Sequence, residues 1–197
     1  MKSEETDDQL MQAYARGHLR AFDRLYARYS ARLFAYLVRN CRDRSRAEEL
    51  YQDIWLRVIS SAEKYKPDGR FDSWIFTLAH HRLVDYYKSS ENRAQTETFQ
   101  SHRVTERGPE EEVSTGHLLQ TIETMVDALP SEQKMAFYLR EESGFSIREI
   151  AGIQGISPEA AKSRLRYAYE KLRKALKVKG IKGESVSRRN IASGGEV

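Results

Sequence analysis

The sequence has few of the features that place a protein outside the cytoplasm. Its 197 residues contain one cysteine, Cys41, so no disulfide can form within the chain, and a reducing compartment suits it. No run of about 18 apolar residues is present, so we expect no membrane insertion. The first ten residues are polar and acidic, unlike the basic and then apolar start of a secretory leader. Together these features predict a cytoplasmic protein.

Signals for β-strands are also scarce. The chain holds 4 prolines, 11 glycines and few of the alternating valine, isoleucine and threonine runs that mark strands. Apolar residues instead recur at helical spacing along most of the sequence. We therefore predict an all-α fold.

Signatures of catalysis are absent as well. The sequence has no glycine-rich phosphate loop, no nucleophile elbow and no CxxC pair. Its adjacent histidines, His80 and His81, would point about 100° apart on a helix, which is poor geometry for a shared metal ion. The sequence therefore predicts no catalytic residue, no metal site, no cofactor and no enzyme activity.

The C-terminal part of the chain is basic. The formal net charge is only +4, but the pI is 9.1 and basic residues concentrate toward the C-terminus. Residues 157–182 carry nine lysines and arginines against two glutamates. Such a local excess of positive charge is typical of a surface that binds phosphate groups.

Two helices joined by a tight turn are predicted for residues 145–176. Ser146 and Glu149 match a capping box, so a short helix should begin at the next residue after Ser146. Gly155 should end it, because a helix exit often needs the left-handed conformation that glycine tolerates. Ser157 then caps a second helix. Two helices linked in this way are typical of a helix-turn-helix.

The second of these helices, which starts at Pro158, has an apolar stripe and a charged face. The stripe consists of Ala161, Leu165, Ala168 and Leu172. The opposite face carries Glu159, Lys162, Ser163, Arg166 and Arg173. A surface helical hairpin with solvated charges would have the same caps, but it would not explain the bias toward basic residues. We therefore interpret this segment as a DNA-binding helix-turn-helix.

Three helices are predicted in the N-terminal half of the chain. The first two cover residues 8–16 and 19–40, and Ser45 with Glu48 predicts a second capping box at the start of the third. One side of the third helix is apolar and should be buried. Its other faces form an acidic, amide-bearing surface of Glu48, Glu49, Gln52 and Asp53.

A loop and a long helix follow. Pro-Asp-Gly turn chemistry predicts a loop over residues 60–70, and residues 71–88 should form a helix capped by Asp72. Cationic and aromatic side chains mingle in this block: Lys64, Tyr65, Lys66, Arg70, Trp74, His80, His81, Arg82, Tyr86, Tyr87 and Lys88. The mixture suits single-stranded nucleic acid, since bases stack on rings while phosphates meet cations. The alternative is that this helix is mainly core.

The sequence divides into two small helical domains. Residues 91–115 lack apolar periodicity and contain a Gly-Pro pair and three successive glutamates, which predicts a flexible linker. The linker joins a domain of residues 1–90 to the helix-turn-helix domain of residues 116–178, and the two should move independently unless a partner holds them. Residues 179–197, rich in glycine, serine and basic residues, are predicted to be a disordered tail.

The order of these blocks resembles that of bacterial RNA polymerase sigma factors of the extracytoplasmic-function (ECF) type. The resemblance covers residues 21–88 and 116–176. AEELYQDIWLRV (47–58) resembles the segment that binds core polymerase, and FDSWIFTLAHHRLVDYYK (71–88) resembles the segments that open and read the −10 promoter element. Residues 129–173 resemble the domain that reads the −35 element. Many regulators share one helix-turn-helix, but the three blocks in this order are specific to the family.

The resemblance implies a function and a set of partners. The protein would bind core RNA polymerase through its β′ and β subunits and direct it to specific promoters. It would recognise the −10 and −35 elements of promoter DNA and promote strand opening for transcription initiation. An anti-sigma factor is the expected regulatory partner.

The resemblance also implies roles for individual residues. The core-binding residues would be Glu48, Glu49, Gln52 and Asp53. The −10 contacts would come from Lys64, Tyr65, Arg70, Trp74, His80, His81, Arg82 and Lys88, with the loop at 61–70 capturing a flipped base. The −35 contacts would be Ser157, Glu159, Lys162, Ser163 and Arg166, on a helix that lies in the major groove.

Two positions depart from the family pattern. Arg46 stands where the family usually has an acid, which weakens part of the core-binding surface. His80 and His81 replace the usual Arg-Asn pair, so the family's −10 preference does not carry over. A histidine could bond a base edge, and its charge would follow pH.

Two other classes of protein compete with this interpretation. A transcriptional repressor or activator would explain the helix-turn-helix equally well, with the first domain as a sensor or dimerisation module. It would not explain an acidic face followed by an aromatic and basic helix. An enzyme that acts on nucleic acid would need carboxylate or metal-ligand spacing that the sequence lacks.

Overall fold

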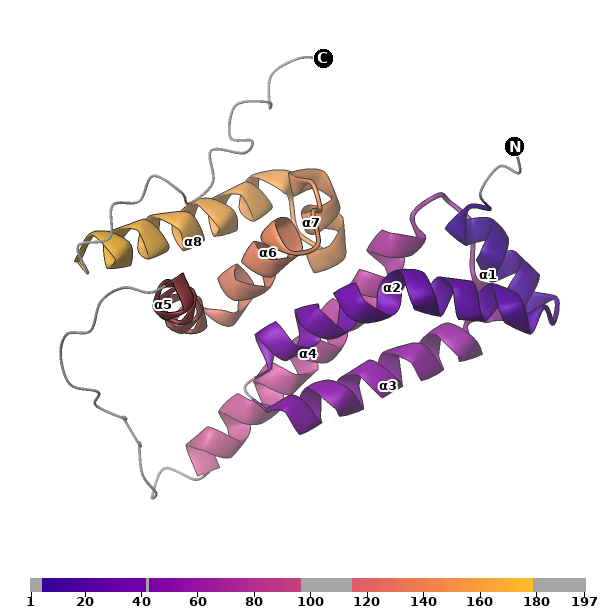
Figure 1. The fold of residues 1–197 in the computed structure, drawn as a ribbon, viewed down its shortest axis with the longest axis horizontal. Helices are drawn as coiled ribbons and strands as arrows, with labels where there is room; N and C mark the ends of the chain where they lie inside the picture. Colours follow the sequence, from indigo (N-terminus) through magenta and orange to yellow (C-terminus); the bar gives the residue numbers. More distant parts are fainter. Residues whose placement is uncertain (1–4, 42, 97–114, 179–197) are drawn as a thin grey trace, which may run out of the picture.

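The computed structural model describes residues 5–41, 43–96 and 115–178, and every regular element in these ranges is helical. The helices form two groups, α1 to α4 and α5 to α8 (Figure 1). This confirms the predicted all-α fold with two helical domains. Residues 97–114 of the predicted linker and the predicted tail at 179–197 lie outside the described residues.

The N-terminal domain is organised around one long central helix. Its elements are α1 (Asp7–Ala15), α2 (Leu19–Asn40), α3 (Arg44–Ser60), a 3-10 turn (Ala62–Lys64) and α4 (Phe71–Thr96). Helix α2 packs against α1, α3 and α4. Its apolar residues recur every three or four positions, so Leu25, Leu33 and Leu37 all point inward and are fully buried. This core fixes the directions of α3 and α4, which carry the predicted functional residues.

Helix α3 starts differently from the prediction. The capping box expected from Ser45 and Glu48 does not form, because Asp43 takes the N-cap position two residues earlier. The Asp43 carboxylate accepts a hydrogen bond from the Ser45 N–H at 2.8 Å, which leaves Ser45 inside the first turn. Glu48 pairs instead with Arg44 at 3.1 Å.

Helix α4 differs from the prediction at both ends. It begins at Phe71, so the predicted cap Asp72 lies inside the first turn. The Arg70 carbonyl accepts the first helical hydrogen bond, from the Trp74 N–H at 2.9 Å. The helix also continues to Thr96, across the start of the predicted linker. Because the segment ENRAQT has no glycine or proline and is rich in helix formers, the backbone stays helical beyond the last apolar residue.

The C-terminal domain consists of α5 (Thr115–Asp127), α6 (Ser131–Glu141), α7 (Ile147–Gln154) and α8 (Pro158–Val178). The predicted turn chemistry between α7 and α8 is confirmed. Ser146 and Glu149 form a capping box, and Gly155 ends α7 in the left-handed conformation with φ 64°. The Ser157 hydroxyl accepts a hydrogen bond from the Ala160 N–H at 3.1 Å at the start of α8.

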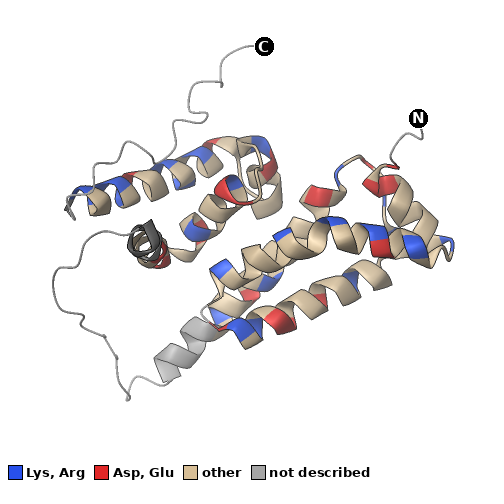
Figure 2. Ribbon diagram, in the orientation of Figure 1, with Lys and Arg blue, Asp and Glu red and all other residues tan. Residues whose placement is uncertain are grey.

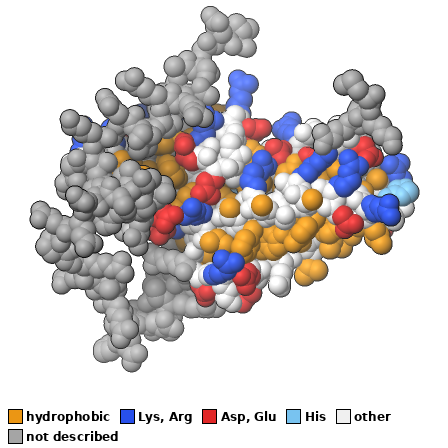
Figure 3. All heavy atoms as spheres, viewed as in Figure 1, with side chains coloured by type: hydrophobic (Ala, Val, Ile, Leu, Met, Phe, Trp, Pro, Cys, Tyr) orange, Lys and Arg blue, Asp and Glu red, His pale blue; other side chains and the backbone are white. Residues whose placement is uncertain are grey.

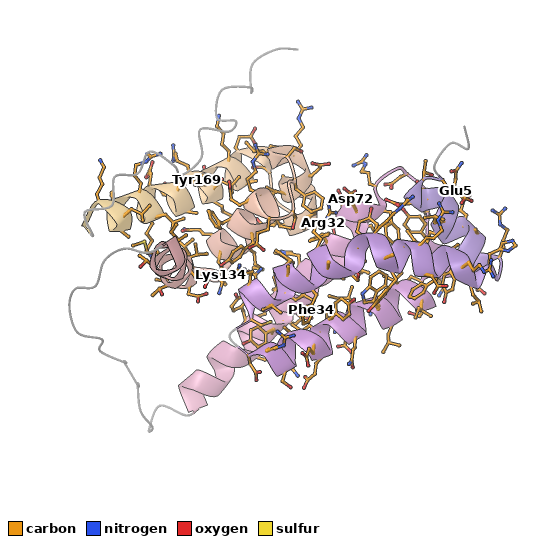
Figure 4. The ribbon with its side chains drawn as sticks, in the orientation of Figure 1. Glu5, Arg32, Phe34, Asp72, Lys134 and Tyr169 are labelled. Carbon is orange, nitrogen blue, oxygen red and sulfur yellow. The ribbon has the colours of Figure 1, made fainter. Side chains whose placement is uncertain are left out.

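The two domains pack directly against each other in this structure, and their predicted independent movement stays a prediction. Helix α4 contacts α7, and α2 contacts α6. The rings of Phe76 and Phe145 meet edge to face with centroids 4.9 Å apart. The Arg32 guanidinium, which points toward the C-terminal domain (Figure 4), lies 5.0 and 5.4 Å from these two ring centres. Arg39 adds an ion pair to Glu142 at 3.0 Å. Long-range side-chain contacts of this kind leave no periodic signal in the sequence.

Candidate nucleic-acid interface

Lysines and arginines recur along α8 (Figure 2), and two of them, Lys162 and Arg166, are exposed in its N-terminal half. Among the residues predicted to contact the −35 element, Ser157, Glu159, Lys162 and Arg166 are exposed and Ser163 is half-buried. Glu159, Lys162 and Arg166 follow at intervals of three and four residues, so they share one face over roughly 10 Å of helix. The Arg166 guanidinium lies 5.1 Å from the centre of the exposed Tyr167 ring. This face of α8 is therefore open to solvent.

Arg164 has a structural role that the sequence analysis did not assign. It donates a hydrogen bond to Gln154 Oε1 at 3.0 Å and pairs with the Glu132 carboxylate at 2.5 Å. Gln154 in turn donates to the Glu132 carbonyl at 3.3 Å. These bonds join α6, α7 and α8 at the turn. The signal for this role was its spacing, three residues after Ala161 and four before Ala168, which places Arg164 beside the apolar stripe.

Four of the predicted −10 residues come together around the start of α4. The Tyr65 ring packs edge-on against Trp74, with centroids 5.0 Å apart, and against Phe71 at 5.8 Å. Tyr65 and Trp74 are half-buried, while Lys64 and Arg70 are exposed beside them. Partly exposed aromatic rings next to cations suit an unstacked nucleotide, because its base can stack on a ring while its phosphate meets a cation.

Three more of the predicted −10 residues lie farther along α4. Trp74, His81 and Lys88 follow one another at intervals of seven residues, so they lie on the same face of the helix. His81 and Lys88 are exposed, and Arg82 is half-buried beside His81. The face that begins at the loop thus continues for roughly 20 Å along α4.

His80 lies apart from this face and is 6% exposed. Burial, together with the smaller effects of the charges of His81 and Arg164, lowers its pKa from 6.5 to about 4. Its Nδ1 has no hydrogen-bond partner among the described residues. In this arrangement the imidazole is neutral at pH 7 and is covered rather than presented to DNA. The buried residues Phe76 and Leu83, four before and three after it, were the sequence signal for this position.

The four residues predicted to bind core polymerase, Glu48, Glu49, Gln52 and Asp53, are all exposed on α3. Glu48 and Glu49 each pair with an arginine of the same helix, Arg44 and Arg46. Arg46, which stands where the family usually has an acid, therefore partly neutralises the charge of Glu49. Among the side chains that the structure describes, none pairs with Asp53, so its charge is the most available of the three.

The exposed face of α3 also carries apolar side chains that the sequence analysis missed. Leu56 is 62% exposed and Ile59 is 41% exposed. At 100° per residue, Leu56 lies between Gln52 and Glu49 around the helix. An apolar band crosses the surface over α2 and α3 (Figure 3). The signal was that Leu56 falls opposite the buried stripe, where an apolar residue has no packing role in the fold.

The described ranges hold no group of three histidine, cysteine, aspartate or glutamate side chains placed to bind a metal ion. No helix within them combines the length and the apolar character needed to cross a membrane. Cys41 is buried, and burial raises the pKa of its thiol to about 11. A thiol that stays protonated at neutral pH is a poor nucleophile.

Comparison with known proteins assigns the family. Residues 25–93 match the family model for Sigma-70 region 2, and residues 119–172 match that for Sigma-70 region 4. RNA polymerase sigma factor CarQ of Myxococcus xanthus is 34% identical over 175 residues, which cover 84% of this chain and 95% of CarQ. ECF RNA polymerase sigma factor SigK of Mycolicibacterium vanbaalenii is 30% identical over 176 residues, which cover 87% of this chain and 89% of SigK. The chain belongs to the ECF sigma factors.

Two solved structures share the fold of this sigma factor. CnrH, solved in complex with the cytosolic domain of CnrY, has a TM-score of 0.67 and 21% identity, and the match covers 88% of this chain and 99% of CnrH. The sigma factor RpoE from Bartonella quintana, solved with the anti-sigma factor NepR, has a TM-score of 0.66 and 22% identity. That match covers 80% of this chain and 97% of RpoE.

This sigma factor therefore acts in transcription initiation by directing RNA polymerase to promoters. The family resemblance drawn from the three sequence blocks is confirmed. The region 2 match runs from α2 through α3 into α4, and the region 4 match runs from α5 into α8. Sigma factors are initiation factors rather than catalysts. The roles of individual residues stay predictions.

Proposed function

We propose that this sigma factor docks on core RNA polymerase through the exposed face of α3. The observation that carries the proposal is the exposure of Glu49, Gln52 and Asp53 around Leu56, on a helix whose opposite side is fully buried. A surface with an apolar centre and an acidic rim suits a partner with an apolar contact and basic surroundings. The proposed partner surface is on the β′ subunit, and the β subunit is proposed as a second partner.

The −10 element is proposed to bind along the loop before α4 and the exposed face of that helix. Trp74 and Tyr65 would stack on unpaired bases, while Lys64, Arg70 and Lys88 would meet the phosphates. Trapping unstacked bases favours strand opening, since the bases lose their stacking partners in the duplex and regain them on the protein. The −35 element is proposed to bind α8, with Lys162, Ser163 and Arg166 at the base edges or phosphates.

Promoter binding is proposed to require separation of the two domains. The −10 and −35 elements are about 25 base pairs apart, or roughly 85 Å along B-form DNA. Each domain is roughly 30 Å across, so two domains in direct contact cannot reach both elements at once. Separation would also uncover His80, which the packed arrangement buries.

An anti-sigma factor is the proposed regulatory partner, supported by the complex of the similarly folded RpoE with NepR. The cytoplasm is the proposed site of action, because bacterial RNA polymerase and promoter DNA are found there. The protein is proposed to have no catalytic activity of its own and to use no cofactor.

Reconstitution with core RNA polymerase tests the proposed function. Gel filtration of the two proteins without DNA should give a co-eluting complex, because a sigma factor binds the enzyme before it meets a promoter. The complex should then transcribe a selected subset of a randomised promoter library. A protein that binds duplex DNA but neither co-elutes nor initiates transcription would instead be a repressor or activator.

A further inference from the structure

One carboxylate of α1 holds the loop before α4 at both ends. Asp8 accepts a hydrogen bond from the Tyr65 hydroxyl at 2.6 Å through Oδ1. It accepts a second, from the Gly69 N–H at 2.6 Å, through Oδ2. The loop runs beside the first turn of α1 in Figure 1. Asp8 therefore bridges two donors that lie four residues apart and fixes the segment between them.

The first turn of α1 is itself anchored to α2. Asp7 accepts hydrogen bonds from Arg28 at 2.5 Å and from the Tyr29 hydroxyl. Glu5, which is labelled in Figure 4, pairs with Arg24. Since these contacts fix the start of α1 on the core, the carboxylate that holds the loop extends from a rigid support.

The loop turns at Gly69, where the backbone takes a conformation that glycine tolerates. Gly69 has φ 76°, in the left-handed region, and the neighbouring Asp68 accepts a hydrogen bond from the Arg70 N–H at 3.2 Å. Burial of the Tyr65 ring raises its pKa, and the hydrogen bond to Asp8 raises it further, so the hydroxyl keeps the proton that it donates. The cations Lys66 and Arg70 remain exposed on the outside of the loop.

We propose that Asp8 is a positioning residue for recognition of the −10 element. Its carboxylate fixes the loop so that Arg70 and the ring of Trp74 meet unstacked DNA in one arrangement. The inference rests on the proposed function of this loop and of α4. Asp8 precedes the match to Sigma-70 region 2 at residues 25–93, so the family match assigns it no role.

A carboxylate can accept a hydrogen bond from the Tyr65 hydroxyl through one oxygen and from the Gly69 N–H through the other. An asparagine side chain has nearly the same shape, but one of its two terminal groups is an NH₂ that cannot accept a hydrogen bond. Asp8→Asn should therefore lose one of the two contacts and free one end of the loop. Asp23→Asn is the matched control, because it makes the same change at an exposed position on α2, outside the contacts that hold α1 and the loop.

The test uses the full-length protein with core RNA polymerase and a promoter template. Strand opening at the −10 element is followed by 2-aminopurine fluorescence, and −10 selectivity by transcription from templates with single-base changes. Asp8→Asn should reduce opening about tenfold, the effect of losing one hydrogen bond to a charged group, and should flatten the −10 selectivity profile. Binding to core polymerase and the response to −35 changes should stay at wild-type levels.

A second variant links the effect to the loop. Tyr65→Phe keeps the ring but removes one donor, so it should weaken opening, and the double variant should lose less than the sum of the two single effects. If Asp8→Asn keeps the wild-type opening rate and −10 profile, or if Asp23→Asn matches its losses, Asp8 has no positioning role. If the wild-type protein fails to bind core polymerase or shows no −10 selectivity, the proposed function itself fails.

Discussion

At the scale of single residues, two residues of the same type can have different structural roles because their side chains meet different surroundings. His80 and His81 are adjacent and chemically identical, yet His80 is buried where the charge of Arg164 in the C-terminal domain reaches it, and His81 faces solvent. Arg164 and Arg166 are two positions apart, yet the first is bonded to Glu132 and Gln154 while the second lies on the open face of α8. Each pair is separated by the direction in which its helix points the side chain.

Because the His80 imidazole is buried, we expect the folded protein to lose stability at acidic pH. The pKa of His80 is about 4 in the folded protein and 6.5 when unperturbed, so only the unfolded or opened state takes up a proton as pH falls from 6.5 toward 4. Stability is therefore full above pH 6.5 and lost through that window, by about 2 kcal/mol at pH 5. Denaturant unfolding at pH 7 and pH 5 measures the loss. His80→Gln should reduce this pH dependence and the exposed control His81→Gln should not. An unchanged pH dependence in His80→Gln would contradict the prediction.

Because Arg166 lies on the exposed face of α8, we expect its removal to weaken binding to the −35 element. Arg166→Ala should weaken binding by about 1–3 kcal/mol if the guanidinium reads a guanine edge, and the loss should vanish on templates that lack that base. A phosphate contact would instead weaken binding similarly on all sequences. Arg173→Ala, exposed two turns later on the same helix, is the matched control. Wild-type binding of Arg166→Ala on every template would place the side chain outside the groove.

At the scale of elements, local chemistry predicted the helix-turn-helix well. The capping box at Ser146, the left-handed Gly155 and the cap at Ser157 all form as the sequence indicated. At α3 the same reasoning failed, because Asp43 was an equally good cap and lay closer to the true helix start. Local rules therefore predict that a helix exists more reliably than they choose between two competing caps.

Alanine substitutions at Gly152, within α7, and at Gly155, its C-cap, should change the stability of the protein in opposite directions. Gly155 has φ 64°, so Gly155→Ala should destabilise the protein by about 1 kcal/mol. Gly152 is helical and exposed, and a Cβ there would meet nothing within 4 Å, so Gly152→Ala should stabilise by about 0.5–1 kcal/mol. Denaturant unfolding of the two variants measures both effects. Shifts of the same sign would contradict the assigned backbone conformations.

The end of α4 shows where pattern reasoning stops. The apolar periodicity that predicts a helix ends near Lys88, but the backbone continues to Thr96 on propensity alone. Contacts between distant segments are equally invisible to periodicity. Asp8 bonding Tyr65 and Gly69, and Phe76 meeting Phe145, depend on tertiary packing that no local window contains. The sequence thus predicted which helices carry the candidate site, but not how α1 and the second domain act on it.

At the scale of the whole molecule, the interface between the domains contains both stabilising contacts and buried polar groups that lack hydrogen-bond partners. Ring packing and the Arg39 ion pairs hold α2 and α4 against the C-terminal domain. The same interface buries Nδ1 of His80 and leaves Nε and Nη2 of Arg32 without hydrogen-bond partners among the described residues. Each such buried group costs about 1–3 kcal/mol. An interface with this balance is suited to open when promoter DNA and polymerase supply better contacts.

The central claim is that the exposed face of α3 docks on core RNA polymerase. Reversing two of its charges, in Glu49→Lys with Asp53→Lys, should leave helical content and melting temperature nearly unchanged. Both side chains are exposed, and an exposed ion pair such as Arg46 with Glu49 contributes only tenths of a kcal/mol. Like-charge contact with a basic partner surface should instead cost several kcal/mol of binding.

The decisive measurement is the affinity of this double variant for core RNA polymerase in the absence of DNA. Asp85→Lys with Glu170→Lys makes the same change in net charge at exposed positions on α4 and α8 and serves as the control. The wild-type protein and the control should bind with the same affinity, while the α3 variant should bind at least about 100-fold more weakly and direct no promoter-specific transcription. Wild-type affinity in the α3 variant would contradict the assignment of this face as the docking surface.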